Sequence, residues 1–193
     1  MCTAFSGSKR IATGDLQVVA VKAKAVLDRD KWAQVLIFDD VTSQVVEVDF
    51  RGTADDVSRR IEERGAETVA SAPDEARGPG RPKLGVVARE VTLLPRHWEW
   101  LASQPGGASA ALRRLVDEAR HSRQDKDRRR RALESAYRFV SAMAGNEAGF
   151  EEAVRALFAG KRERFQEMTE VWPMDVRDHA RKLAGVAFGA GTC

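Results

Sequence analysis

Residues 77–131, RGPGRPKLGVVAREVTLLPRHWEWLASQPGGASAALRRLVDEARHSRQDKDRRRR, are the stretch around which this chain is organised. Apolar side chains recur at helical spacing in two of its segments, and a turn of Pro105, Gly106 and Gly107 separates those segments. The stretch divides into successive pieces: a basic Gly/Pro-rich arm at 78–83, an apolar run at 86–94 before Pro95, amphipathic segments at 97–103 and 109–120, and arginines at 128–131. This order predicts an arm, a strand, a helix, a turn, a second helix and a basic tail.

Positive charge is concentrated around this stretch. Residues 81–145 hold 14 Lys/Arg and 7 Asp/Glu, whereas residues 1–80 hold 11 and 14, and residues 146–193 hold 7 and 8. The net charge of +3 for the 193-residue chain conceals this basic block. A local basic block between mildly acidic flanks favours a polyanionic partner such as nucleic acid.

Residues 1–66 are predicted to form a small α+β unit. Residues 3–13 fit a short hairpin or strand, and residues 16–28 carry apolar side chains at helical spacing. Residues 35–38 form a continuous apolar run, and residues 45–50 alternate apolar and acidic side chains. Together the last two segments predict a β-hairpin with one buried face.

The rest of the chain divides by composition. A helix over residues 54–64 is expected to begin at Thr53, whose side chain suits a cap. Residues 67–84 are rich in Ala, Pro, Gly, Glu and Arg, which predicts a flexible linker. Residues 85–123 hold the strand and two helices described above. Apolar stripes predict further helices in the C-terminal region 124–193, over residues 125–143, 150–161, 161–171 and 175–187.

The segment 85–123 resembles the ribbon-helix-helix fold, in which two chains pair single strands into a ribbon above interlocked helices. Pro95 resembles the proline that opens the first helix of that fold. Gly107 and Ser109 resemble the glycine and serine of its turn, and Ser109 is suited to cap the second helix. About 35 residues bury too little surface to be stable alone. The resemblance therefore implies a homodimer that binds double-stranded DNA.

The resemblance also implies which residues would contact DNA. Outward side chains of the ribbon, here Arg89 and Thr92, would face base edges in the major groove. The start of the second helix, with Ser109 and Arg113, would hold a phosphate. The strand offers few polar groups on either face, which favours phosphate contacts over sequence-specific contacts.

Two flanking segments add candidate DNA contacts. The arm at residues 80–83 resembles the Gly-Arg-Pro core of an AT-hook, which would place Arg81 and Lys83 in the minor groove. A solvated linker is the alternative for this arm. The arginine run is a candidate for phosphate contacts or a solvated helix face, and its members are Arg128, Arg129, Arg130 and Arg131.

No catalytic residue, metal site or cofactor is expected. Asp39 and Asp40 lie between two apolar segments, where such residues usually form a turn rather than a metal site. An enzyme would need a pocket that joins these carboxylates with Glu47 and His179, and nothing in the sequence brings them together.

The sequence predicts a cytoplasmic protein, located at the nucleoid if it binds DNA. No run of about 18 apolar residues is present, as a transmembrane helix would require. The N-terminus lacks the apolar core of a signal peptide. Cys2 and Cys193 lie at opposite ends, which argues against a structural disulfide or metal site.

Nearly the whole chain resembles a bacterial family catalogued as domain of unknown function 2239. The resemblance rests on the segments LIFDD (36–40), VEVDFRG (46–52), REVTLLPRHW (89–98) and GGAS (106–109). It implies no activity. Our sequence-based hypothesis is a DNA-binding protein and not an enzyme: a dimeric ribbon-helix-helix-like transcriptional regulator or a nucleoid-associated protein. The alternative is a protein-interaction or antitoxin-like module that uses the same unit only to dimerise.

Overall fold

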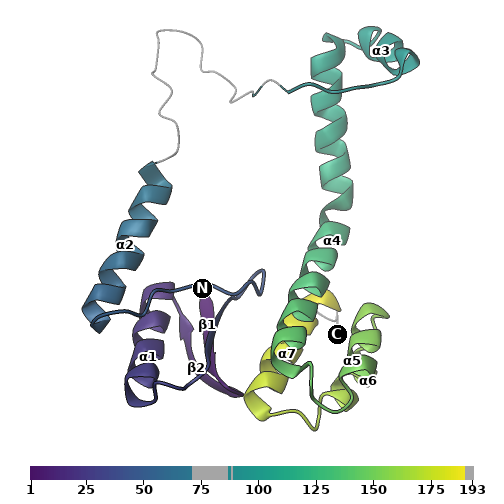
Figure 1. Cartoon of the computed structure of the whole chain (residues 1–193). Coiled ribbons are helices and arrows are strands. Elements are labelled where there is room, and N and C mark those ends of the chain that lie inside the picture. The colour runs from purple at the N-terminus through teal and green to yellow at the C-terminus, as the bar shows by residue number, and fades with distance from the viewer. Residues whose placement is uncertain (71–86, 88, 190–193) are drawn as a thin grey trace. The chain divides into compact units, whose positions relative to one another are not determined.

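The computed structural model describes residues 1–70, 87 and 89–189, with the backbone alone for residues 65–70. The chain divides into two compact units. The first, called the core unit below, joins Met1–Ala72 with Lys126–Cys193. The second, called the inserted unit, is Pro73–Asp125. Figure 1 shows the helices and strands of both units.

A three-stranded antiparallel sheet opens the core unit, with the strand order β2-β1-β3. Strands β1 (Cys2–Ser6) and β2 (Lys9–Gly14) form the hairpin expected over residues 3–13. Gly7 lies in its turn with a φ of 54°, a left-handed conformation that glycine adopts without steric cost. Helix α1 (Leu16–Arg29) follows directly, as the helical spacing of its apolar residues predicted.

The predicted hairpin between residues 35–38 and 45–50 forms only at its turn, where the N–H of Asp39 donates to the Gln44 oxygen over 2.9 Å and the N–H of Val46 donates to the Ile37 oxygen over 2.8 Å. Strand β3 (Val35–Asp39) pairs with β1 along its whole length. Within the described residues a single bridge, Phe38 to Val45, joins β3 to the later segment. The apolar residues of that segment pack on the cluster between the sheet and α1. Their alternation therefore reflects burial of one face rather than pairing in a sheet.

Helix α2 (Ala54–Ala70) begins at the predicted cap. The backbone N–H of Asp56 donates to Thr53 Oγ1 over 3.2 Å, and the N–H of Thr53 donates to Asp56 Oδ2 over 3.0 Å. This reciprocal pair is a capping box with Asp in place of Glu. The helix continues through residues 67–70, which were expected to begin the linker. The remainder of the expected linker, residues 71–84, lies outside the described residues.

The C-terminal region is helical, as predicted. Its helices are the second part of α4 (Gly107–Ala144), α5 (Phe150–Phe158), α6 (Arg162–Met168) and α7 (Met174–Ala187). Gly149 and Gly160 have φ values of 78° and 69° and lie before and after α5. These left-handed glycines allow the sharp turns that bring the helices together.

The two faces of the sheet contribute to two different cores, because successive side chains of a strand point to opposite faces. Ala4 and Ile37 pack with the buried side chains of α1. Phe5 and Phe38 pack instead with the C-terminal helices, through ring contacts with Phe139 of α4 at 5.4 and 5.2 Å. Residues from the two ends of the chain thus share one hydrophobic core, and the sheet lies between α1 and the C-terminal helices (Figure 1).

The inserted unit contains α3 (Pro95–Ala102) and the first part of α4. Pro95 opens α3 as predicted, because its fixed φ suits the first helical position. The turn through Gly106 and Gly107 is also present, with φ values of 83° and 75°. Within the described part of this unit, Leu101 and Ala111 are the only buried side chains.

Three predictions for this region are wrong. Residue 87 and residues 89–94 form no strand, so the described residues of this chain contain no ribbon-helix-helix unit. The helices expected at 109–120 and 125–143 are one continuous helix, α4, because residues 121–124 contain neither Gly nor Pro to stop it. Ser109 lies inside the first turn of α4 and does not cap it. Among the described helices, none is long and apolar enough to cross a membrane.

Candidate nucleic-acid interface

The predicted DNA contacts fall on both units. Arg81 and Lys83 lie outside the described residues. Arg89 and Thr92 are exposed in the irregular segment before α3. In the inserted unit, the exposed predicted contacts on α4 are Ser109 and Arg113; in the core unit they are Arg128, Arg129, Arg130 and Arg131. The structure therefore groups these contacts along α4, with Ser109 and Arg113 about one helical turn apart and the four arginines in consecutive positions.

The strongest concentration of charge is in residues 126–131 of α4, called the basic turn below. These six residues include five cations and one carboxylate, Asp127. Arg130 pairs with that carboxylate over 3.4 Å, and Arg131 Nε donates to the backbone oxygen of the same residue over 3.3 Å. By formal charge the turn has a net charge of +4, and with Asp125 immediately before it residues 125–131 carry +3. Arginine and lysine are good helix formers, which is why the charge does not interrupt α4.

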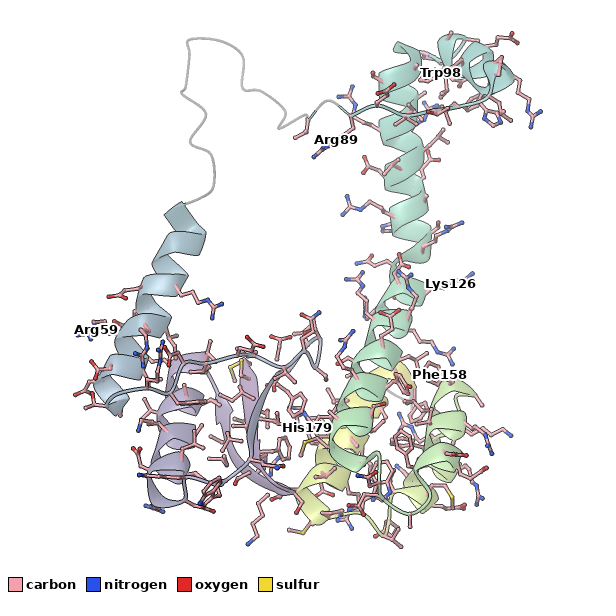
Figure 2. All side chains as sticks on the ribbon, in the orientation of Figure 1. Arg59, Arg89, Trp98, Lys126, Phe158 and His179 are labelled. Carbon is pink, nitrogen blue, oxygen red and sulfur yellow. The ribbon has the colours of Figure 1, made fainter. Side chains whose placement is uncertain are left out.

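An exposed aromatic pair lies further along the same helix. Tyr137 of α4 and Phe158 of α5 are 42% and 52% exposed, and their ring centroids are 5.5 Å apart at 58°. They line a shallow groove, called the aromatic groove below, together with Glu134, Arg138, Ser141 and Ala142. Figure 2 labels Phe158, and Lys126 further toward the start of α4.

Arg129 extends from the basic turn to the end of α5. Its Nη2 atom lies 2.9 Å from the position that a Cβ on Gly160 would occupy. Gly160 lies in the turn that ends α5. The basic turn and the aromatic groove thus both lie along α4 and the end of α5. Cations and exposed aromatic rings on one surface are the combination that binds phosphates and bases.

Arg138, at the edge of the groove, also anchors the core unit. Its guanidinium group donates a hydrogen bond to the backbone oxygen of Thr42, in the turn after β3. One turn earlier on α4, the hydroxyl groups of Ser135 and Ser43 are 2.8 Å apart and buried. These contacts fix the groove end of α4 against the N-terminal sheet.

Asp39 and Asp40, which were considered for an enzyme, make local structural hydrogen bonds. Asp39 accepts hydrogen bonds from the N–H groups of Val41 and Thr42 at 3.1 and 2.8 Å, which is turn chemistry. Burial tends to raise the pKa of Asp39, but these hydrogen bonds outweigh it and the pKa is lowered. Asp40 accepts from the Thr3 hydroxyl at 2.6 Å. In the described part of the chain, no cluster of three or more His, Cys, Asp or Glu residues could hold a metal ion.

His179 is buried and away from solvent, so no substrate can reach it from outside. Its ring packs on Phe139 at 4.5 Å and on Phe5 at 5.5 Å. Burial, with smaller contributions from Lys182 and Arg10, lowers its pKa to about 4, and Asp40 opposes them. The imidazole is therefore neutral at pH 7, and its Nε2 atom has no hydrogen-bond partner among the described residues.

Tyr137 and Phe158 were not predicted as functional residues. Each fits the apolar stripe of its own helix, so the sequence indicated two core residues. Their contact joins two helices, and their exposure depends on how those helices pack. The one available signal was the Arg-rich turn before Tyr137 on the same helix, since basic and aromatic residues together are typical of nucleic-acid-binding surfaces.

No significant match to this chain is found among curated proteins or among solved structures. A family model does match, over residues 1–184, and its description is "Uncharacterized protein conserved in bacteria (DUF2239)". The match covers almost the whole length of the sequence. The chain therefore belongs to the DUF2239 family of bacterial proteins.

Proposed function

We propose that this protein binds DNA through phosphate contacts made by the basic turn of α4. The observation that carries the proposal is the excess of cations in residues 126–131, held on the exposed surface of a helix with one carboxylate among them. Phosphate contacts of this kind release counterions from the nucleic acid and supply affinity that does not depend on base sequence. This favours the nucleoid-associated alternative over a sequence-specific regulator.

The two residues predicted to contact bases, Arg89 and Thr92, give less support to DNA binding than the basic turn does. Arg89 and Thr92 lie in an irregular segment whose neighbours Val91 and Leu94 are exposed and apolar. Residue 87 and residues 89–94 form no strand from which a ribbon with a second chain could be built. The basic turn requires no such ribbon, because its cations already lie on a formed helix.

Charge-neutral replacement of the basic turn tests the proposal. The test variant has four arginines changed to Gln: Arg128, Arg129, Arg130 and Arg131. It is expected to bind duplex DNA about tenfold or more weakly. The slope of log affinity against log salt concentration is expected to become shallower by the equivalent of about three to four phosphate contacts. The measurement is fluorescence anisotropy of a labelled duplex between about 50 and 200 mM salt.

The matched control removes the same charge elsewhere. Four exposed arginines that each pair with a carboxylate are changed to Gln: Arg51, Arg59, Arg155 and Arg164. This control is expected to keep most of the affinity and the salt dependence. Equal losses in both variants would show that only net charge matters. Failure of the unaltered protein to bind any DNA at low salt, whether duplex or single strand, would reject the proposed function.

We propose further that the inserted unit joins two chains into a homodimer. On α4, Val116 is 54% exposed and Leu115 is 38% exposed, and they continue an apolar stripe that includes Ala111 and Leu112. A unit of this size with two buried side chains in its described part cannot offset the entropy of ordering it. A second copy of the chain carries the same stripe, so two copies would cover each other's apolar side chains in a symmetric dimer.

The oligomeric state tests the dimer. Changing Leu115 and Val116 together to Glu is expected to convert a dimer into a monomer, since four charges would meet in one apolar interface. Light scattering on the eluted protein gives the mass. Changing His121 to Glu, on the opposite side of the helix by its spacing, is the control and is expected to leave the dimer intact. A monomeric unaltered protein contradicts this proposal.

The alternative function is a protein-interaction module. It is favoured by Trp98 and Trp100 of α3, which are 41% and 50% exposed. Tryptophan is common at the centre of protein interfaces. A dimer that binds no DNA at low salt would favour this alternative, whereas salt-sensitive DNA binding favours the basic turn.

A further inference from the structure

We infer that the aromatic groove of the core unit holds an unpaired nucleobase, so that the protein prefers single-stranded or unwound DNA to intact duplex. The inference rests on the proposed function and names the form of DNA that the same surface would take. It starts from Tyr137 and Phe158, two large rings that remain about half exposed although each contacts the other.

The groove offers a face for stacking. Its two rings are tilted at 58° to each other, and the small side chains Ser141 and Ala142 lie beside them. Every base has two flat π-faces, and stacking on an aromatic side chain tolerates any sequence. In a duplex these faces are covered by neighbouring base pairs, so only an unpaired base can stack in the groove.

The charges around the groove match a nucleotide with its phosphates outside and its base inside. Arg129 lies against the turn at Gly160, which ends α5. The basic turn begins about three helical turns before Tyr137, about 16 Å along α4, and its last residue, Arg131, lies about 9 Å away along the helix. These cations would meet the phosphates on either side of the stacked base. The one carboxylate in the groove, Glu134, would repel a phosphate but can accept a hydrogen bond from the amino group of a base.

This charge arrangement separates a nucleobase from the other possible occupants. A second copy of the chain or an apolar peptide would cover the rings but would leave the cations of the basic turn unneutralised. A free phosphate or polyphosphate would satisfy the cations and leave the rings exposed. A single strand of DNA satisfies both features at once.

Affinity for two forms of DNA tests the inference. Tyr137→Ala and Phe158→Ala are each expected to weaken binding of a labelled single strand of about 15 nucleotides by about 5- to 100-fold, and to leave binding of a duplex of the same length unchanged. Tyr137→Phe, which keeps the ring, is expected to retain the affinity for the single strand. Because both positions are half exposed, the alanine variants are expected to stay folded, and thermal unfolding checks this.

A spectroscopic measurement reports on the groove alone. The chain has one tyrosine, so fluorotyrosine incorporation labels Tyr137 and no other position. Its fluorine resonance is expected to shift when the single strand is added, and to stay in place with duplex or with polyphosphate. An equal shift with polyphosphate, or a shift that depends on protein concentration without DNA, would overturn the inference.

The two proposals fail in different ways. If the unaltered protein binds neither form of DNA, the proposed function fails. If it binds both forms and the arginine variant loses both, the proposed function stands. In that case, equal affinity of the Tyr137→Ala variant and the unaltered protein for the single strand overturns only the stacking in the groove.

Discussion

Replacing Phe139 with alanine is expected to lower the free energy of unfolding by about 3–5 kcal/mol, the usual cost of removing a fully buried phenylalanine. The ring is completely buried on α4. It contacts Phe5 of β1 at 5.4 Å, Phe38 of β3 at 5.2 Å and His179 of α7 at 4.5 Å. The cavity left by the variant would therefore adjoin the sheet and a C-terminal helix at once.

The loss of stability in the Phe139→Ala variant should appear in both the N-terminal sheet and the C-terminal helices. Both parts contribute rings to the cluster around Phe139. Hydrogen exchange is expected to accelerate in β1 and β3 as well as in α5–α7, with denaturant unfolding giving the total change. Phe158→Ala is the matched control, because its ring is half exposed and loses one aromatic contact worth about 1 kcal/mol. Faster exchange limited to the C-terminal helices would show that the sheet is stable without them.

A second large effect is expected from acid. His179 has its pKa lowered from 6.5 to about 4 in the folded protein, mainly because burial disfavours its charged form. In the unfolded chain the imidazole is protonated below pH 6.5, whereas in the folded protein it stays neutral until about pH 4. Protonation therefore favours the unfolded state over this interval. The neutral histidine costs no stability above pH 6.5, and the stability lost by pH 4 is about 3 kcal/mol.

The variant His179→Phe is expected to remove this part of the acid sensitivity. Its free energy of unfolding, measured with denaturant from pH 7 to pH 4, should fall by about 3 kcal/mol less than that of the unaltered protein. The test compares how steeply the free energy of unfolding changes with pH in the two proteins, so it holds even if the phenyl ring changes the stability at pH 7. His121→Gln is the control, since it removes an exposed histidine from the same chain. Identical slopes for the unaltered protein and His179→Phe would contradict the assignment.

Local patterns predicted the elements that depend on local interactions. The spacing of apolar residues predicted α1 and the C-terminal helices, and Thr53 predicted the start of α2. Pro95 predicted the start of α3 in the same way. In each case the stabilising contacts lie within one or two helical turns, so a short window of sequence contains the necessary information.

Features that depend on distant partners could not be predicted. Residues 35–39 suit pairing with residues 45–50 or with β1, and the aromatic contacts that favour β1 involve Phe139, about a hundred residues later. The packing of the N-terminal sheet against the C-terminal helices depends on the same ring contacts with Phe139, so a short window of sequence could not reveal it either. The continuous α4 was missed because a change of composition from apolar to basic suggested a boundary, although residues 121–124 contain no helix-breaking residue.

The candidate site was predictable in part for the same reason. The four arginines of the basic turn are visible in the sequence because they are adjacent. The contact between Tyr137 and Phe158 is not, because the turns after α4 and α5 set the distance between the two rings. A charge cluster can be recognised by counting, whereas an exposed aromatic pair requires the packing of two helices.

Because the two ends of the chain share one hydrophobic core, the N-terminal sheet cannot bury its aromatic face until the C-terminal helices have been translated. Phe5 and Phe38 leave the ribosome about a hundred residues before Phe139, with which they pack. At about 5–20 residues per second, the aromatic face of the sheet stays uncovered for about 5–20 s while residues 39–139 are being translated. The nascent chain therefore presents an unpaired apolar surface during that interval, as a binding site for a chaperone would require. Truncated chains that end before α4 would carry the same surface permanently.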